Sequence, residues 1–136
     1  MKIKLDTDTI RYIGLFETMT KAFVKDCIPG EDKIVFVVKE NNAKKAIGKK
    51  GVNVRYLQNA LNKRIEIIEY SEDPLKFIRN IFRPAKMKEM YMSEKSNGIK
   101  VIHIAPSTDK GLVKSKLKTA KYFINKYYNI DEIMVH

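Results

Sequence analysis

Hydrophobic side chains recur along this chain with two different spacings, one typical of helices and one typical of strands. Between residues 9 and 23 they return every three or four positions, and Ile10, Phe16 and Phe23 fall on one face of a predicted helix. The run KIVFVVK at 33–39 is rich in β-branched residues and predicts a strand. The elements expected in the first half are a helix over 9–23, strands over 24–28 and 33–39, helices over 43–47 and 52–62, and a strand over 64–71.

The same order of elements begins again after residue 71. The stretch SEDP at 71–74 supplies an acidic cap and a proline at the first helical position. The helix predicted there ends at Arg83-Pro84, because a residue before proline is driven out of the helical region. A hairpin follows, with its turn at 96–98. The elements expected in the second half are a helix over 74–82, strands over 86–94 and 99–105, helices over 109–113 and 116–128, and a strand over 131–136.

The order helix, strand, strand, helix, helix, strand therefore occurs twice, in units of about 65 residues each. This order predicts an α/β (α+β) fold with two domains, 1–72 and 73–136, each a three-stranded sheet packed against helices. A chain of 136 residues is long enough for two small cores. We expect a monomer, because two complementary modules of this size can support each other.

The positive charge is concentrated in two windows of the chain. The sequence has 27 Lys and Arg against 16 Asp and Glu, a net charge of +11. Residues 39–64 hold eight basic groups and Glu40 as their only acid, and residues 110–126 hold six lysines and no acid. Such segregation indicates basic faces for a polyanionic partner. The alternative is a pair of lysine-rich helix exteriors that bind nothing.

Several other classes of protein are not supported by the composition. No apolar run approaches the roughly 20 residues of a membrane span, and the first ten residues lack the apolar centre of a signal peptide. We therefore expect a cytoplasmic protein without a membrane partner. Cys27 is the single cysteine, and with His103 and His136 it forms no recognisable metal-ligand pattern. We interpret His103 as a packed polar residue and expect no metal, no cofactor and no catalysis.

The stretch KKAIGKKGVNV at 44–54 places the tetrapeptide GKKG between two predicted helices, the first capped by Asn41 or Asn42. Glycines at both ends let the backbone approach a ligand closely. The amides of Val52 and Asn53, which open the next helix, are expected to face outward at its positive end, where phosphate binds. The structural alternative is a tight helix connection with incidental lysines.

A helix, a GxxG loop, a second helix and a neighbouring strand form the architecture of the KH module, which clamps about four nucleotides of single-stranded nucleic acid. Ile47 and Val54 are expected to floor a groove beside the strand at 33–39, in which unpaired bases lie flat. The candidate RNA-binding residues are Lys44, Lys45, Ile47, Gly48, Lys49, Lys50, Gly51, Asn53, Val54 and Arg55.

Three segments resemble the archaeal NusA-like transcription termination and antitermination factors. They are AIGKKGVNVRYL at 46–57, YSEDPLKFIRNIFRPAKM at 70–87 and IAPSTDKGL at 104–112. Members of this family consist of little more than two tandem type II KH modules. The resemblance implies that the protein binds nascent single-stranded RNA and acts with RNA polymerase.

The second unit departs from the family pattern. Where its own glycine loop should stand, the sequence is Ser115-Lys116-Leu117-Lys118. Close approach of the backbone to a phosphate is not expected there. The remaining lysines predict auxiliary contact with RNA, and the alternative is that this region only supports the first module. The auxiliary candidates are Lys114, Lys116, Lys118 and Lys121.

Three functions are compatible with these observations. The first is a non-catalytic single-stranded RNA-binding transcription factor that acts with RNA polymerase in elongation or termination. The second is a protein-docking module of a polymerase or ribosome. The third is a subunit that presents RNA to a processing enzyme.

Overall fold

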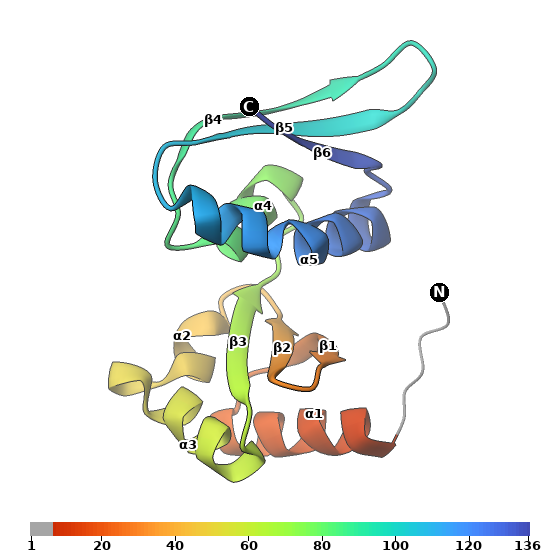
Figure 1. Ribbon diagram of the computed structural model, residues 1–136. Helices are drawn as coiled ribbons and strands as arrows, with labels where there is room; N and C mark the ends of the chain where they lie inside the picture. Colours follow the sequence, from red (N-terminus) through yellow and green to blue (C-terminus); the bar gives the residue numbers. More distant parts are fainter. Residues whose placement is uncertain (1–6) are drawn as a thin grey trace. The chain divides into compact units, whose positions relative to one another are not determined.

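The computed structural model describes residues 7–136 and divides the chain into two compact units, Met1–Tyr70 and Ser71–His136 (Figure 1). Among the described residues, no helix combines the length and the apolar character needed to cross a membrane. The first unit contains α1 (Thr7–Thr20), β1 (Val24–Pro29), β2 (Lys33–Val38), α2 (Ala43–Ile47), the 3₁₀ turn η1 (Lys49–Gly51), α3 (Val52–Leu61) and β3 (Arg64–Glu69).

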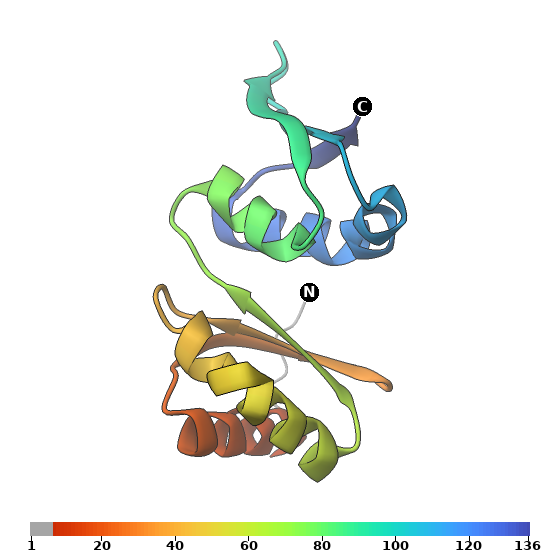
Figure 2. The same cartoon turned by 90° about the vertical axis from the view of Figure 1, so that its left-hand side faces the viewer.

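The first unit is a three-stranded sheet with its helices packed on one face (Figure 2). The strand order is β1-β2-β3, with β1 antiparallel and β3 parallel to the central β2. Alternate residues of β2, Ile34, Phe36 and Val38, enter the core, as the period of two along a strand requires. The ring of Phe36 stacks on that of Phe16 in α1, with centroids 4.2 Å apart. The three helices thus share one core with the central strand.

The first helix is shorter at its end than the sequence predicts. It stops at Thr20, because Lys21 adopts a left-handed backbone conformation, with φ of 64°. The Thr20 hydroxyl donates to the carbonyl of Phe16 and accepts from the amide of Ala22, which fixes the exit. The predicted apolar face includes Ile10 and Phe23, but these side chains are 57% and 58% exposed and do not join the core.

Helix α2 has the predicted bounds but not the predicted cap. Asn42 occupies the N-cap position, yet its side chain makes no capping bond. Its Oδ1 accepts from the amide of Phe23 at 2.9 Å, and its Nδ2 donates to the carbonyl of Glu40. The amide of Ala43 donates instead to Oε1 of Glu69 in β3, 3.1 Å away. The start of α2 is therefore tied to both β1 and β3.

The second unit contains a second three-stranded sheet, in the order β4-β5-β6, with α4 and α5 along one face (Figures 1 and 2). Asp73 caps α4 through a bond from the amide of Leu75, and Pro74 stands at the first helical position, as predicted. The Phe77 ring contacts Phe123 edge to face in the core. The elements are α4 (Pro74–Phe82), β4 (Met87–Glu94), β5 (Lys100–Pro106), α5 (Lys110–Tyr128) and β6 (Glu132–Val135).

The prediction of two helices over 109–113 and 116–128 is wrong. One continuous helix, α5, runs from Lys110 to Tyr128. The sequence after Gly111 contains no glycine or proline that interrupts a helix, and the Ser115 hydroxyl bonds back to the carbonyl of Leu112 within it. The second unit therefore has the order helix, strand, strand, helix, strand, and no loop divides the helix at 115–118.

Candidate nucleic-acid interface

The GKKG segment forms a tight turn that connects α2 to α3. Gly48 adopts φ of 77° and Gly51 φ of 73°, a region that favours glycine. The amide of Gly48 donates to the carbonyl of Lys44, and the amide of Gly51 donates to the carbonyl of Gly48. Lys50 also has positive φ, 55°, and both lysine side chains at the tip are exposed. The turn therefore presents two ammonium groups on a hydrogen-bonded frame.

Two predicted RNA-binding residues brace this turn from α3. The Nδ2 atom of Asn53 donates to the carbonyl of Lys45 at 3.0 Å, which ties α3 back to α2. The guanidinium of Arg55 donates to the carbonyl of Lys50 at the tip. These bonds hold the turn in shape, and Arg55 also keeps its positive charge beside the loop.

One of the two amides predicted to face an anion, that of Val52, is not available. The predicted outward amide of Val52 is engaged, because η1 runs directly into α3 and this amide donates to the carbonyl of Lys49. Lys49 and Lys50 stand at the first positions of η1, where amides have no acceptor farther back in the same turn. Lys49 and Lys50 therefore supply both the ammonium groups and the first backbone amides of the 3₁₀ turn.

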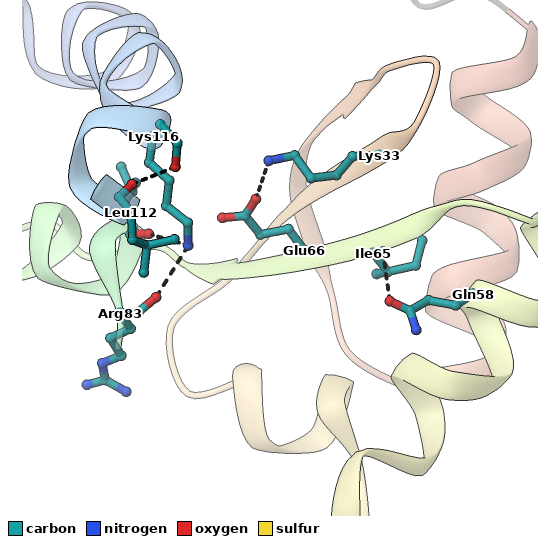
Figure 3. Close-up of polar contacts among 9 residues, drawn as sticks. Lys33, Gln58, Ile65, Glu66, Arg83, Leu112 and Lys116 are labelled. Carbon is teal, nitrogen blue, oxygen red and sulfur yellow. Dashed lines mark hydrogen bonds and ion pairs between the residues drawn. The ribbon is translucent and has the colours of Figure 1, made fainter. Parts of the chain in front are cut away.

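The strand that borders α2 and α3 is β3, not the predicted strand at 33–39, which lies in the middle of the sheet. The amide of Ile65 in β3 donates to Oε1 of Gln58 in α3, 3.2 Å away (Figure 3). Val54 is half-buried against the core, whereas Ile47 at the end of α2 is 40% exposed. The apolar surface beside the loop is therefore bounded by β3.

The acidic side chains of β3 are engaged within the unit. Oε2 of Glu66 lies 2.8 Å from Nζ of Lys33 (Figure 3). Glu69 accepts from the amide of Ala43 at the start of α2. Both carboxylates have positive or amide partners, so they oppose an incoming polyanion less than exposed carboxylates do. Lys44 and Lys45 are exposed on α2, which leads into the loop, and add positive charge near it.

Replacing Gly48 with alanine is expected to weaken single-stranded RNA binding severalfold. A Cβ atom at Gly48 lies 2.8 Å from Cγ of Asn53, so Asn53 must leave the carbonyl of Lys45. The positive φ adds a cost of about 1–2 kcal/mol. Fluorescence anisotropy and thermal unfolding measure the two effects.

The matched control is Gly111→Ala. A Cβ there meets nothing within 4 Å, and the position lies in the first turn of α5. This variant is expected to gain roughly 0.5 kcal/mol of stability and to bind RNA as the unaltered protein does. Equal RNA affinities for Gly48→Ala and Gly111→Ala contradict the proposed importance of the turn geometry.

The auxiliary lysines of the second unit have different environments. Nζ of Lys116 donates to the carbonyls of Ile81 and Arg83, 3.1 and 3.3 Å away, and so caps the end of α4 (Figure 3). The other three, Lys114, Lys118 and Lys121, are exposed on α5. Lys116 therefore has a structural role, and the exposed three supply positive charge without a loop.

A ring cluster on the second sheet was not expected from the sequence. The Nε2 atom of His103 lies 2.6 Å from the Ser93 hydroxyl, and its Nδ1 lies 2.9 Å from Nε2 of His136. The ring of Tyr91 stacks on His103, with centroids 4.5 Å apart. The β4-β5 register, which pairs Tyr91 with His103, is the signal that places these rings together. Both ring nitrogens of His103 are thus satisfied within the sheet.

The described residues 7–136 contain no group of three or more His, Cys, Asp or Glu side chains placed to hold a metal ion. A parallel β2-β3 pair, two helices joined by GKKG and a preceding helix and strand together define a KH module of type II.

Comparison with known proteins agrees with this class. The family model of the KH domain matches residues 10–106. The probable transcription termination protein NusA of Methanococcus vannielii is 41% identical over 119 residues, which cover 87% of this chain and 69% of that protein. The protein of the same name from Methanocaldococcus jannaschii is 33% identical over 138 residues, 98% of this chain and 75% of that protein.

A solved structure has a similar fold. The crystal structure of APE1850 superimposes with a TM-score of 0.74 at 29% identity and covers 93% of this chain and 96% of that one. The chain belongs to the family of archaeal NusA-like transcription termination proteins, whose fold is built from KH modules.

Proposed function

We propose that this protein is a non-catalytic transcription factor that holds single-stranded RNA across Gly48–Gly51 and acts with RNA polymerase in elongation or termination. The observation that carries this proposal is the braced basic turn between α2 and α3. Asn53 and Arg55 fix its carbonyls, and Lys49 and Lys50 present their ammonium groups at its tip. A KH module clamps about four nucleotides with a turn of this kind.

The surroundings of the turn suit an unpaired strand. Phosphates can lie on the lysines, while bases lie against the apolar side chains beside β3. Ile47 and Val52 are both exposed next to the turn and provide such apolar surface. A duplex keeps its bases stacked inside and gains nothing from this surface, so the preference for single strands follows from the position of the apolar residues.

The transcriptional role is supported by the relatives. The curated proteins from two methanogens carry the name probable transcription termination protein. A factor that acts on elongating polymerase meets the transcript as a single strand, and the basic turn offers a site for it. The proposed partner in transcription is therefore RNA polymerase.

A protein-docking function is the second candidate, and the second unit favours it. Helix α5 is continuous and lacks a phosphate-binding turn. Four large apolar side chains are exposed in this unit, which suits contact with a protein more than contact with phosphates. They are Tyr91, Met92, Met134 and Val135.

The two candidate functions predict different RNA-binding behaviour, because only the first requires a preference for single-stranded RNA. We expect the protein to bind one RNA sequence more tightly as a single strand than as a duplex, with an affinity that falls as salt rises. Fluorescence anisotropy at several salt concentrations measures both. Equal affinity for the two forms contradicts the proposed RNA function. Co-purification of RNA polymerase subunits from native extract tests the proposed partner separately.

A further inference from the structure

We propose that Phe23 is a base-stacking site that lengthens the RNA segment held by the first unit. A nucleotide beyond those clamped at Gly48–Gly51 stacks its base on the Phe23 ring and places its phosphate near the Lys39 ammonium. This inference rests on the proposed RNA binding at the loop, and it adds a second contact at the other end of α2.

Exposure alone does not identify this residue. Single apolar side chains are common on protein surfaces, and Ile10 in α1 is exposed to the same degree as Phe23. Phe23 differs from Ile10 in its surroundings, because it stands between α1 and β1 and contacts the start of the helix that leads to the basic turn.

The backbone of Phe23 is held on both sides. Its amide donates to Oδ1 of Asn42 at 2.9 Å, and its carbonyl accepts from the amide of Lys39 at 2.9 Å. Asn42 stands at the N-cap position of α2. The backbone that bears the aromatic ring is therefore hydrogen-bonded both to the residue that follows β2 and to the start of α2. A stacking contact on such a backbone costs little ordering of the protein.

The charge beside the ring suits a nucleotide. Nζ of Lys39 lies over one face of the Phe23 ring, 5.7 Å from its centroid, and both side chains are exposed, so a base stacks on the other face or displaces the lysine. An aromatic face beside an ammonium group is the combination that proteins use for unpaired nucleotides, since every base has a face that stacks and every nucleotide carries a phosphate. Lys39 is also the first residue of the basic window 39–64.

The distance to the loop allows one strand to reach both sites. Helix α2 spans five residues, so Asn42 and Gly48 are separated by about 9 Å along its axis. Lys44 and Lys45 are exposed on this helix and can accompany the backbone of the RNA between the two sites. A strand that leaves the four-nucleotide clamp along α2 toward Asn42 is therefore proposed to reach Phe23 next.

The test compares oligonucleotides of two lengths. One has about four nucleotides, the length a KH groove holds, and the other about eight. Phe23→Ala is expected to weaken binding of the longer RNA about tenfold, the size of one lost stacking contact, and to leave the shorter one unchanged. Phe23→Leu, which keeps apolar bulk but has no aromatic face, is expected to behave like Phe23→Ala.

Ile10→Ala is the matched control, because it removes a similarly exposed apolar side chain from the same unit. It is expected to bind both RNAs as the unaltered protein does. A second measurement uses the longer RNA with 2-aminopurine at each position in turn. Stacking on Phe23 quenches the fluorescence at one position, and Phe23→Leu is expected to restore it.

Three results overturn the proposal. Unchanged affinity of Phe23→Ala for the longer RNA shows that the ring faces a different partner or none. An equal loss for both lengths shows an effect on the loop and not an added contact. Failure of the unaltered protein to bind either RNA overturns the proposed function together with this inference, and it is recognised before any variant is compared.

Discussion

The double variant Lys49→Asp/Lys50→Asp is expected to bind single-stranded RNA well over tenfold more weakly than the unaltered protein. Both side chains are exposed at the tip of the GKKG turn, and both glycines and the bracing Asn53 remain. Each aspartate replaces attraction by repulsion at a position that is proposed to face phosphate. The measurement is anisotropy with a labelled single strand at fixed salt.

The salt dependence of this variant carries separate information. For single strands, the slope of log affinity against log salt changes by about 0.7 for each phosphate contact. The loss of two contacts should therefore make the slope shallower by about 1.4. Thermal unfolding should be unchanged, because the turn keeps its hydrogen bonds. Unchanged RNA affinity in a folded variant contradicts the loop site and favours protein docking.

Phe36→Ala is expected to cost about 3–5 kcal/mol of unfolding free energy, the usual loss for a buried phenylalanine. Phe36 is fully buried in β2, and its ring stacks on that of Phe16 in α1. A unit of this size is marginally stable. The variant should therefore lose the fold that positions the loop, and with it the binding of RNA. Urea unfolding followed by circular dichroism measures the change.

Phe36→Leu is the control for this prediction. Leucine keeps most of the apolar volume in the core, so its loss of stability should be clearly smaller than that of the alanine variant. A loss below about 1 kcal/mol for Phe36→Ala contradicts the assignment of this ring to the centre of the core.

Local signals in the sequence predict the first and last residues of some helices correctly. Helix α4 has the predicted bounds because its start and end are determined by neighbours in sequence, with Pro74 and the Asp73 cap at one end and Arg83-Pro84 at the other. The cap of α2 could not be predicted in this way. The acceptor for the Ala43 amide in its first turn is Oε1 of Glu69, 26 residues farther along the chain, and only the folded sheet brings it there.

The error in α5 has a different origin. The two helices predicted over 109–113 and 116–128 match the element order of the first half, but no residue between them requires a break. The residues from 112 to 128 contain no helix breaker, and Val113, Ala120 and Phe123 bury one continuous face. Local helix propensity and packing therefore outweigh the repeated pattern. Because α5 is continuous, its lysines do not flank a glycine-containing turn like the one between α2 and α3.

The position of the candidate site is visible in the sequence, but its construction is not. The glycines and lysines of GKKG mark the turn. The bonds from Asn53 to Lys45 and from Arg55 to Lys50 depend on how α2 and α3 meet. The bordering strand depends on the sheet order, which places β3 beside β2. The periodicity places Phe23 on the apolar face of the first helix, and only the fold reveals its exposed position next to α2.

The most direct test of the RNA site compares two charge reversals of equal size. Lys49→Asp/Lys50→Asp changes the turn, and Lys118→Asp/Lys121→Asp changes two exposed lysines of α5 by the same net charge. The measurement is the ratio of their Kd values for one single-stranded RNA at one salt concentration. A site at the turn predicts the weaker binding for the first variant, by roughly tenfold or more relative to the second. Equal Kd values, or weaker binding by the α5 variant, contradict it.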